Sequence, residues 1–203
     1  MHTPPRSLAH HAQPTAGFPT RRKMLVAAGA TLASGSWTVA SAQTSAVWPE
    51  VSSAMADARL AGSTRLRVWG FEVYDAQLWV APGFRANQFA QFPLALSLHY
   101  LRALKGAAIA QRSLKEMRGS GSVPEALADQ WLTAMTQTFP NVQANDRLTG
   151  LHQPAVGARF WLNGQPQGEI ADARFSASFF GIWLSEATSE PTLRRELLVG
   201  ATP

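Results

Sequence analysis

Three side chains within residues 62–82 have the chemistry to hold a small acid. Arg65 and Arg67 each carry a guanidinium group, which binds a carboxylate through a planar fork of N–H donors. Tyr74 adds a phenolic hydroxyl that can donate a further hydrogen bond. If the fold brings these three together beside apolar side chains, they define a site for an apolar carboxylic acid.

A β-hairpin would bring them together. Residues 65–68 and 71–80 are typical of strands, and Trp69-Gly70 between them suits a two-residue turn. Such a turn pairs Val68 with Phe71, Arg67 with Glu72, Leu66 with Val73 and Arg65 with Tyr74. One face of the hairpin is then apolar, and the other carries both arginines, the glutamate and the tyrosine before it turns apolar at Ala76.

The polar face of this hairpin also has a simpler interpretation. Arg67 and Glu72 lie opposite each other in the predicted register and can form an ordinary solvent-exposed ion pair. Asp75 interrupts the apolar part of the second strand, where it fits either a ligand contact or a structural hydrogen bond. The pattern alone leaves both interpretations open.

The charge of the chain argues against a nucleic-acid partner once the N-terminus is set aside. The full sequence of 203 residues has a formal net charge of +5. Residues 1–42 contain four basic residues (Arg6, Arg21, Arg22 and Lys23) and no acidic residue, so the remainder carries a net charge of +1. A nearly neutral domain lacks the basic surface that binds phosphate backbones.

Residues 1–42 are predicted to be a twin-arginine-type signal peptide. Arg21 and Arg22 precede a mildly apolar run that is too short to span a bilayer. Ala40-Ser41-Ala42 offers a small-x-small cleavage site. We expect export to the periplasm and no stable membrane insertion after cleavage, with an uncleaved anchor as the alternative. Residues 43–203 then form a single domain with its core over about residues 60–200.

The middle of the chain predicts strands interrupted by helices. A lead-in compatible with a helix over residues 51–60 precedes the hairpin. An irregular link follows over 89–93, and then a strand with alternating burial over 94–101. Two helices come next, over 106–118 and 124–139, and the second has an apolar stripe expected to lie in the core.

The C-terminal part repeats this order of strands followed by helices. Its elements are predicted over residues 146–152, 159–170, 173–184 and 191–199. Asn163-Gly164 is a strong signal for a two-residue hairpin turn, and Asp172 can cap the helix that follows. We therefore predict an α+β fold with a largely antiparallel sheet and helices gathered on one face.

No metal, cofactor or catalytic motif stands out in the sequence. The chain has no cysteine, and the two histidines outside residues 1–42, His99 and His152, lie in different predicted strands. That arrangement argues against a zinc or copper site. No phosphate-binding glycine loop or nucleophile elbow is present, and nothing marks one serine for a Ser-His-Asp triad. We expect no cofactor.

Six segments carry a family resemblance. They are RLRVWGFEVYDAQLWV (65–80), LSLHYLRALKG (96–106), SLKEM (113–117), FPNVQANDRLTG (139–150), RFWLNG (159–164) and FFGIWLSEATSEPTLRRELL (179–198). Together they resemble the bacterial exported branch of the chalcone isomerase-like family. The resemblance implies an open-faced β-sandwich, in which a large antiparallel sheet has helices packed on one face and a ligand cleft lies between the two layers.

The resemblance also implies where a site would lie. Plant members that close a flavanone ring use an arginine on the first long strand, a polar residue on the next strand, and a Tyr, Lys and Asn on the following helix. The matching positions here are Arg65 or Arg67, Tyr74 or Asp75, and helix positions near Ile109, Arg112 and Glu116. The helix tyrosine is missing and an acid replaces the asparagine, so the helix lacks a phenol that would stabilise a developing enolate.

Three functions remain as hypotheses. Because other members of the family bind fatty acids through an arginine and a tyrosine, we favour a non-catalytic exported protein that binds a small apolar or fatty-acid-like carboxylate. The predicted ligand-binding residues are Arg65, Arg67, Tyr74, Asp75, Ile109 and Arg112. The alternatives are an intramolecular lyase of the chalcone isomerase type with an unknown substrate, and a structural or interaction module with a filled cleft. Turnover would distinguish the lyase, and the lack of a ligand-sized pocket would identify the module.

Overall fold

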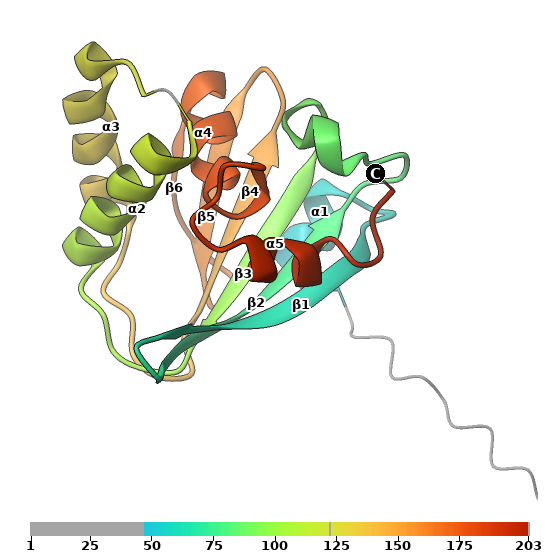
Figure 1. Ribbon diagram of the computed structural model, residues 1–203, viewed down its shortest axis with the longest axis horizontal. Helices are drawn as coiled ribbons and strands as arrows, with labels where there is room; N and C mark the ends of the chain where they lie inside the picture. The colour runs from blue at the N-terminus through green and yellow to red at the C-terminus, as the bar shows by residue number, and fades with distance from the viewer. Residues whose placement is uncertain (1–46, 122, 203) are drawn as a thin grey trace, which may run out of the picture. The chain divides into compact units, whose positions relative to one another are not determined.

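The computed structural model describes residues 47–121 and 123–202, and the predicted fold is confirmed there (Figure 1). Its helices are α1 (Pro49–Ala54), α2 (Gly106–Ser120), α3 (Glu125–Thr138), α4 (Ala173–Leu184) and α5 (Pro191–Leu197), with a 3-10 helix η1 (Ala86–Gln91) in the predicted irregular link. Its strands are β1 (Arg59–Val68), β2 (Phe71–Val80), β3 (Leu94–Tyr100), β4 (Arg147–Gln153), β5 (Gly157–Leu162) and β6 (Gln165–Ile170). The predicted signal peptide, with Arg21, Arg22, Ala40 and Ala42, lies outside the described residues.

The six strands form one antiparallel sheet in which spatial order follows sequence order, β1-β2-β3-β4-β5-β6. Six strands in this order make five neighbouring pairs, and the two strands of one pair are joined by a long connection. β3 and β4 lie side by side although α2 and α3 come between them in the chain. The remaining connections are short by comparison. The sheet is therefore two three-stranded meanders joined along the β3–β4 pair.

Helices α2, α3, α4 and α5 cover one face of the sheet (Figure 1). The α4 helix begins at Asp172, whose side chain accepts hydrogen bonds from the backbone N–H groups of the first turn, as predicted. Phe179 lies at the centre of the interface, with its ring centroid 5.5–5.7 Å from those of Phe139, Phe160 and Phe175. The apolar stripe predicted on the second helix is confirmed as core, since Trp131 and Phe139 are buried.

The N-terminal helix α1 packs on the opposite face of the sheet. Val51 and Met55 contact Trp79, Ala95 and Leu151, which project away from the other helices. The predicted helix over 51–60 is too long, because α1 ends after a turn and a half and β1 already begins at residue 59. The apolar second half of β2 needs a hydrogen-bonded neighbour, and the early start of β1 supplies it.

Both predicted two-residue turns are present and adopt the same backbone conformation. Trp69 and Gly70 have φ angles of 48° and 82°, and Asn163 and Gly164 have φ angles of 51° and 83°. Two successive residues with positive φ are the signature of the hairpin turn that matches strand twist. Asn163 also stabilises its turn, because its side chain accepts from the backbone N–H of Arg147 at 2.8 Å.

The register of the β1–β2 hairpin departs from the prediction beyond its first two residue pairs. Val73 has no partner in β1 and forms a β-bulge. Leu66 consequently pairs with Tyr74, and Arg65 pairs with Asp75. The predicted pairing of Arg65 with Tyr74 is therefore wrong. Because a one-residue slip exchanges the two faces of a strand, Tyr74 and Arg65 end on opposite sides of the sheet.

Candidate functional site

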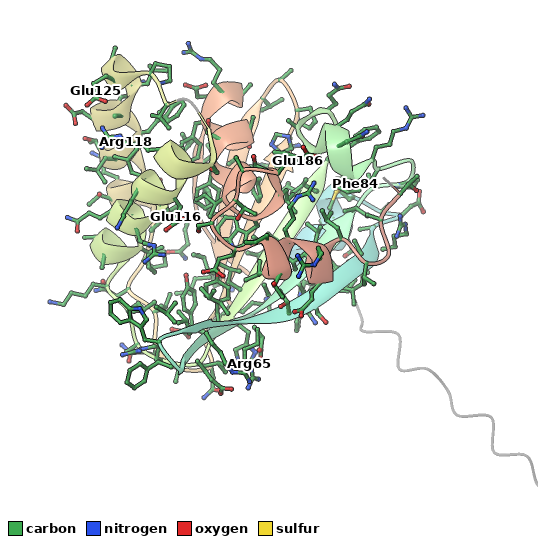
Figure 2. All side chains as sticks on the ribbon, viewed as in Figure 1. Arg65, Phe84, Glu116, Arg118, Glu125 and Glu186 are labelled. Atoms are coloured by element: carbon green, nitrogen blue, oxygen red, sulfur yellow. The ribbon has the colours of Figure 1, made fainter. Side chains whose placement is uncertain are left out.

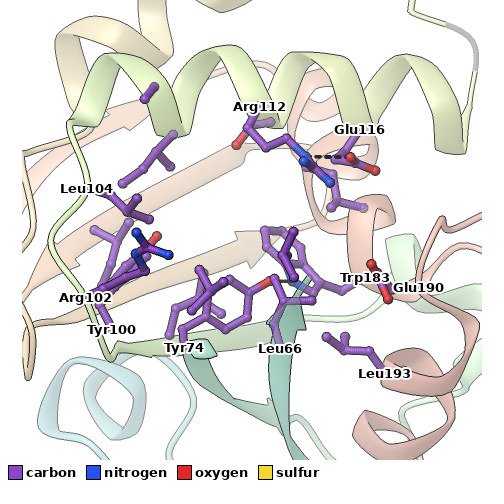
Figure 3. A pocket seen from close by; sticks show the side chains of 18 of the residues that line it. Leu66, Tyr74, Tyr100, Arg102, Leu104, Arg112, Glu116, Trp183, Glu190 and Leu193 are labelled. Atoms are coloured by element: carbon purple, nitrogen blue, oxygen red, sulfur yellow. Dashed lines mark hydrogen bonds and ion pairs between the residues drawn. The ribbon is translucent and has the colours of Figure 1, made fainter. Parts of the chain in front are cut away.

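A cleft of about 380 Å³ lies between the sheet and the helices above it (Figure 3). Its apolar walls come from the β1–β2 hairpin, from β3 and from helices α2, α4 and α5. The wall residues include Leu66, Val73, Leu98, Ile109, Ile182 and Leu193. Because the bulge turns both Val73 and Tyr74 toward this side, the hairpin contributes more cleft surface than a regular strand would. A volume of this size is typical of small-molecule sites.

Two buried tyrosines face the cleft from neighbouring strands. Tyr74 and Tyr100 lie opposite each other in the β2–β3 pair, and their rings meet edge to face with centroids 5.8 Å apart. The indole Nε1 of Trp183 donates a hydrogen bond to the Tyr74 hydroxyl oxygen at 2.9 Å (Figure 3). Burial raises the pKa of both phenols because a phenolate would lose its hydration. Both hydroxyls are therefore neutral donors at physiological pH, and neither donates to a residue that the structure describes.

The charged side chains that line the cleft are the neutralised pair Arg112–Glu116, the carboxylate of Glu190 and the cation of Arg102. Arg112 Nε lies 2.7 Å from Glu116 Oε1, one turn away on α2, and Ser189 Oγ donates to Glu116 Oε2 at 2.6 Å. Arg102 follows the end of β3, and its guanidinium carbon lies 5.6 Å from the centroid of the Phe71 ring. Within residues 47–121 and 123–202, no carboxylate forms an ion pair with Arg102. That arginine is the cation available to an anionic ligand.

The structure divides the six predicted ligand-binding residues between the two faces of the sheet. Those that line the cleft are Tyr74, Ile109 and Arg112. Those on the opposite side are Arg65, Arg67 and Asp75, which do not belong to the cleft lining. Figure 2 shows Arg65 and the cleft residue Glu116 on opposite sides of the β1–β2 ribbon. The bulge at Val73 is the physical reason for this division, because it exchanges the two faces of β2 from Tyr74 onward.

An exposed ion network occupies that opposite side of the hairpin. Arg65 Nε lies 2.5 Å from Asp75 Oδ1, and Arg65 Nη1 lies 2.9 Å from Glu72 Oε1. Arg67 Nη2 lies 2.8 Å from the same oxygen of Glu72. Hydrogen bonds from Arg65 are the main reason that the pKa values of Asp75 and Glu72 lie below their ordinary values. The simpler interpretation of this face as a set of solvent-exposed ion pairs fits the geometry.

A second hollow is polar, and its lining includes Asp75, His99 and Arg147, the last of which forms a buried ion pair with α1. Arg147 Nη2 lies 2.9 Å from Glu50 Oε1, and Thr149 donates to that same oxygen at 2.9 Å. The Arg147 guanidinium carbon lies 3.7 Å from the centroid of the Trp48 ring. The Glu50 side chain is 2 % exposed. These contacts fix α1 against β4, so the pair has a structural role.

Sequence reasoning missed Tyr100, Arg102 and Trp183 as cleft residues. The alternation in β3 already placed Tyr100 on the apolar side of its strand, and that signal could have identified it. Trp183 lies on the apolar surface of α4, and an apolar helix surface alone does not distinguish a cleft residue from a core residue. Arg102 lies beyond the last residue of β3, where no period applies, so its position depends on the fold.

The histidine of β4 is held in a structural contact under α4. His152 Nδ1 lies 2.6 Å from Ser176 Oγ, and His152 Nε2 lies 3.1 Å from the carbonyl oxygen of Ala90. Burial lowers the pKa of His152. A catalytic triad would need an acid where the Ala90 carbonyl lies and an accessible serine, but Ser176 is fully buried. Over the described ranges, no group of three or more His, Cys, Asp or Glu residues is arranged to hold a metal ion.

One antiparallel sheet, helices over one face and a ligand-sized cleft between the layers define an open-faced β-sandwich. The chain belongs to the chalcone isomerase-like family, whose model matches residues 45–199. The predicted membership of the chalcone isomerase-like family and the predicted fold are thereby confirmed, whereas the exported branch of the family stays a prediction. None of the helices described here has the length and apolar character needed to cross a membrane.

Two individual proteins are similar to this chain. An uncharacterized protein of Haemophilus influenzae is 32% identical over 131 residues, which cover 64% of this chain and 63% of that protein. The alignment thus spans less than two thirds of the relative's length. The crystal structure of a fatty-acid binding protein of Arabidopsis thaliana is similar with a TM-score of 0.54 and 12% identity, covering 70% of this chain and 86% of that one. At that identity the likeness establishes the fold alone.

Proposed function

We propose that the chain is a binding protein that holds a small apolar carboxylic acid in its cleft. The observation that carries this proposal is the combination of apolar walls with two neutral phenols and the cation of Arg102. Apolar walls take up a hydrocarbon tail, and a guanidinium group with hydroxyl donors takes up a carboxylate. The structurally similar Arabidopsis protein is a fatty-acid binding protein, which supports the same ligand class.

The carboxylate belongs at Arg102 because the other arginine of the cleft is already neutralised. Arg112 shares its charge with Glu116, and a ligand anion there would compete with a carboxylate that Ser189 also holds. Tyr100, two residues before Arg102 in the chain, offers a hydroxyl on the cleft side. A volume of about 380 Å³ equals that of roughly a dozen water molecules, which suits an acid of about a dozen carbon atoms.

Calorimetric titration with dodecanoate tests this assignment. We expect Arg102→Ala to weaken binding by about 1.5–3 kcal/mol, the range for a hydrogen bond to a charged group. Arg65→Ala is the matched control, since it removes an arginine of the same hairpin region from the opposite face and should leave the affinity unchanged. Equal affinities for the wild type and Arg102→Ala would refute the place of the carboxylate. A wild type that binds no dodecanoate would refute the proposed ligand class.

An intramolecular lyase is the second candidate, and the two phenols are the observation that favours it. A neutral tyrosine in an apolar cleft can order a water molecule or stabilise an enolate oxygen. On α2, however, the position of the plant tyrosine is matched by Ile109, and Glu116 is held by Arg112 and Ser189. We therefore expect no useful acceleration of chalcone cyclisation. A protein-dependent rate that disappears in Tyr74→Phe would establish the lyase instead.

We further propose that the protein acts in the periplasm after twin-arginine export. The support is the sequence of residues 1–42, with its paired arginines, short apolar run and Ala40-Ser41-Ala42 site. The double substitution Arg21→Lys, Arg22→Lys should abolish accumulation in the periplasm. Accumulation of this variant at the wild-type level would refute the assignment, and N-terminal sequencing of the exported protein would locate the cleavage site.

A further inference from the structure

We propose that the tip of the β1–β2 hairpin docks on an anionic lipid surface, from which an apolar acid can enter the cleft. We call this region the aromatic tip and define it as Trp69 and Phe71 with the neighbouring cations Arg102 and Lys105. Docking itself stands independently of the function proposed above, whereas entry of the acid into the cleft rests on it.

The aromatic tip exposes two large apolar side chains at the end of the sheet. Trp69 is 94% exposed and Phe71 is 63% exposed. Both also line the mouth of the cleft, together with Val68 and Val73 of the same hairpin. Figure 1 shows the β1–β2 turn projecting at one end of the sheet, beyond the helices that cover its centre. The apolar surface of the cleft therefore continues outward onto the tip.

The backbone conformation of the tip indicates that Trp69 does not stabilise the turn in which it lies. Asn163 and Trp69 have nearly the same positive φ in equivalent turns, but positive φ favours Asn or Gly and is unusual for a bulky residue. Asn163 forms side-chain hydrogen bonds that stabilise its turn. Trp69 forms no side-chain hydrogen bond with any residue in the described ranges. An outlier of this kind is a reason to look for a function outside folding.

The charges around the tip complement an anionic surface. Arg102 lies over the Phe71 ring, and Lys105 follows it on the exposed β3–α2 connection. Neither cation has an ion-pair partner among the residues of the described structure. Glu72, the acidic residue closest to the tip in sequence, is held by Arg65 and Arg67 on the opposite side of the hairpin. Phosphate headgroups would therefore meet cations on the side where the cleft opens.

The size of the tip favours a lipid surface over a protein partner. A specific protein interface usually buries about 800 Å² on each side. Two aromatic side chains supply roughly 150–250 Å² each, which is too little for a stable interface but typical of an interfacial anchor. Tryptophan prefers the boundary between headgroups and acyl chains, where its ring is in apolar surroundings and its N–H remains hydrated. The indole N–H of Trp69 is free to be hydrated in this way.

Binding of the full chain to vesicles of phosphatidylglycerol and phosphatidylcholine tests the proposal. Trp69→Asn introduces the residue that the second turn uses, so the melting temperature should stay the same or rise. The same substitution should weaken binding to these vesicles about tenfold. Lys105→Gln should weaken it about fivefold, and the wild type should bind pure phosphatidylcholine vesicles less tightly. Residues 1–42 are the same in every variant, so differences between variants report the tip.

Val199→Asn is the matched control, because Val199 is 81% exposed and does not line the cleft. It should leave vesicle binding unchanged. Wild-type protein that does not bind these vesicles, or a Trp69→Asn variant that binds them as tightly as the wild type does, would overturn the proposal. Self-association that Trp69→Asn abolishes, without vesicle binding, would assign the tip to a second copy and overturn it as well. Vesicle binding by a wild type that fails to bind dodecanoate would uphold docking and refute the proposed ligand.

Discussion

Tyr74 and Asp75 are adjacent in β2, yet they belong to two environments that differ in how charge is handled. Tyr74 faces the cleft, where burial raises the pKa of its hydroxyl and keeps it neutral. Asp75 faces the opposite side, where the Arg65 guanidinium lowers the pKa of its carboxyl and keeps it ionised. The cleft face thus offers neutral donors, the cation of Arg102 and the carboxylate of Glu190, whereas the exposed network on the opposite face pairs its charges with one another. Abundance of charge therefore does not locate the candidate cleft in this molecule.

The largest expected loss of stability comes from an ion pair on the opposite face that is buried rather than exposed. This pair tests whether all paired charges of that face contribute equally little. Arg147→Ala leaves the Glu50 carboxylate without its cation and removes the contact with Trp48. We expect the free energy of unfolding, measured in urea, to fall by about 3–5 kcal/mol. Arg159→Ala is the control, since Arg159 and Glu169 are 49% and 66% exposed and lie 3.7 Å apart. Arg159→Ala should lower the free energy of unfolding by about 0–1 kcal/mol. Similar losses for both variants would contradict the distinction between a buried and an exposed ion pair.

A smaller effect is expected from the phenols of the cleft face. Tyr74→Phe removes the acceptor of the Trp183 indole N–H and leaves that donor unpaired in a buried position. The free energy of unfolding should fall by about 1–3 kcal/mol. Tyr100→Phe removes a hydroxyl with no hydrogen bond to a described residue, and its loss should be smaller. A greater loss from Tyr100→Phe would show that its hydroxyl, rather than that of Tyr74, stabilises the fold.

The smallest expected effect concerns the exposed ion network and depends on pH. Because Arg65 lowers the pKa values of Glu72 and Asp75 in the folded state, the unfolded chain binds more protons below the ordinary carboxylate pKa of about 4. The stability that this network contributes is present above that pH and is lost as the pH falls through the lowered values. Arg65→Gln should therefore lower the stability slightly at neutral pH and flatten the acid side of the profile, so that the profiles of variant and wild type converge at low pH. An acid limb as steep as that of the wild type would show that Arg65 does not set these pKa values.

Local patterns predicted the fold because each element has its own signal. Trp69-Gly70 and Asn163-Gly164 marked their turns, alternation marked β3, and Asp172 marked the start of α4. These signals depend on neighbouring residues in the chain, and the structure retains them. The lead-in helix and the start of the first strand, predicted at residue 65, were badly placed, because the need of β2 for a partner strand extends β1 back to Arg59.

The candidate site could not be predicted to the same extent. The bulge at Val73 has no glycine or other local marker, and it alone decides that Tyr74 rather than Arg65 faces the helices. The run of apolar residues from Ala76 to Val80 already shared the parity of Tyr74, so the period of β2 favoured the correct face. The arginines outweighed that signal in the prediction. Arg102 could not be found at all, because its position follows from the path of the chain after β3.

The connection between β3 and β4 has a consequence for how the chain reaches its native state. Each three-stranded meander can form from nearby segments, β1 to β3 with a turn and a short link, and β4 to β6 with two tight turns. Joining them requires closing residues 101–146 into a loop, and the entropy of that closure is lost before the β3–β4 hydrogen bonds compensate for it. Pairing of β3 with β4, which we call the seam between the two meanders, is then expected to be a late step of folding. Since the cleft takes residues from both sides of the seam, with Leu98 on β3 and Leu148 on β4, it would form last.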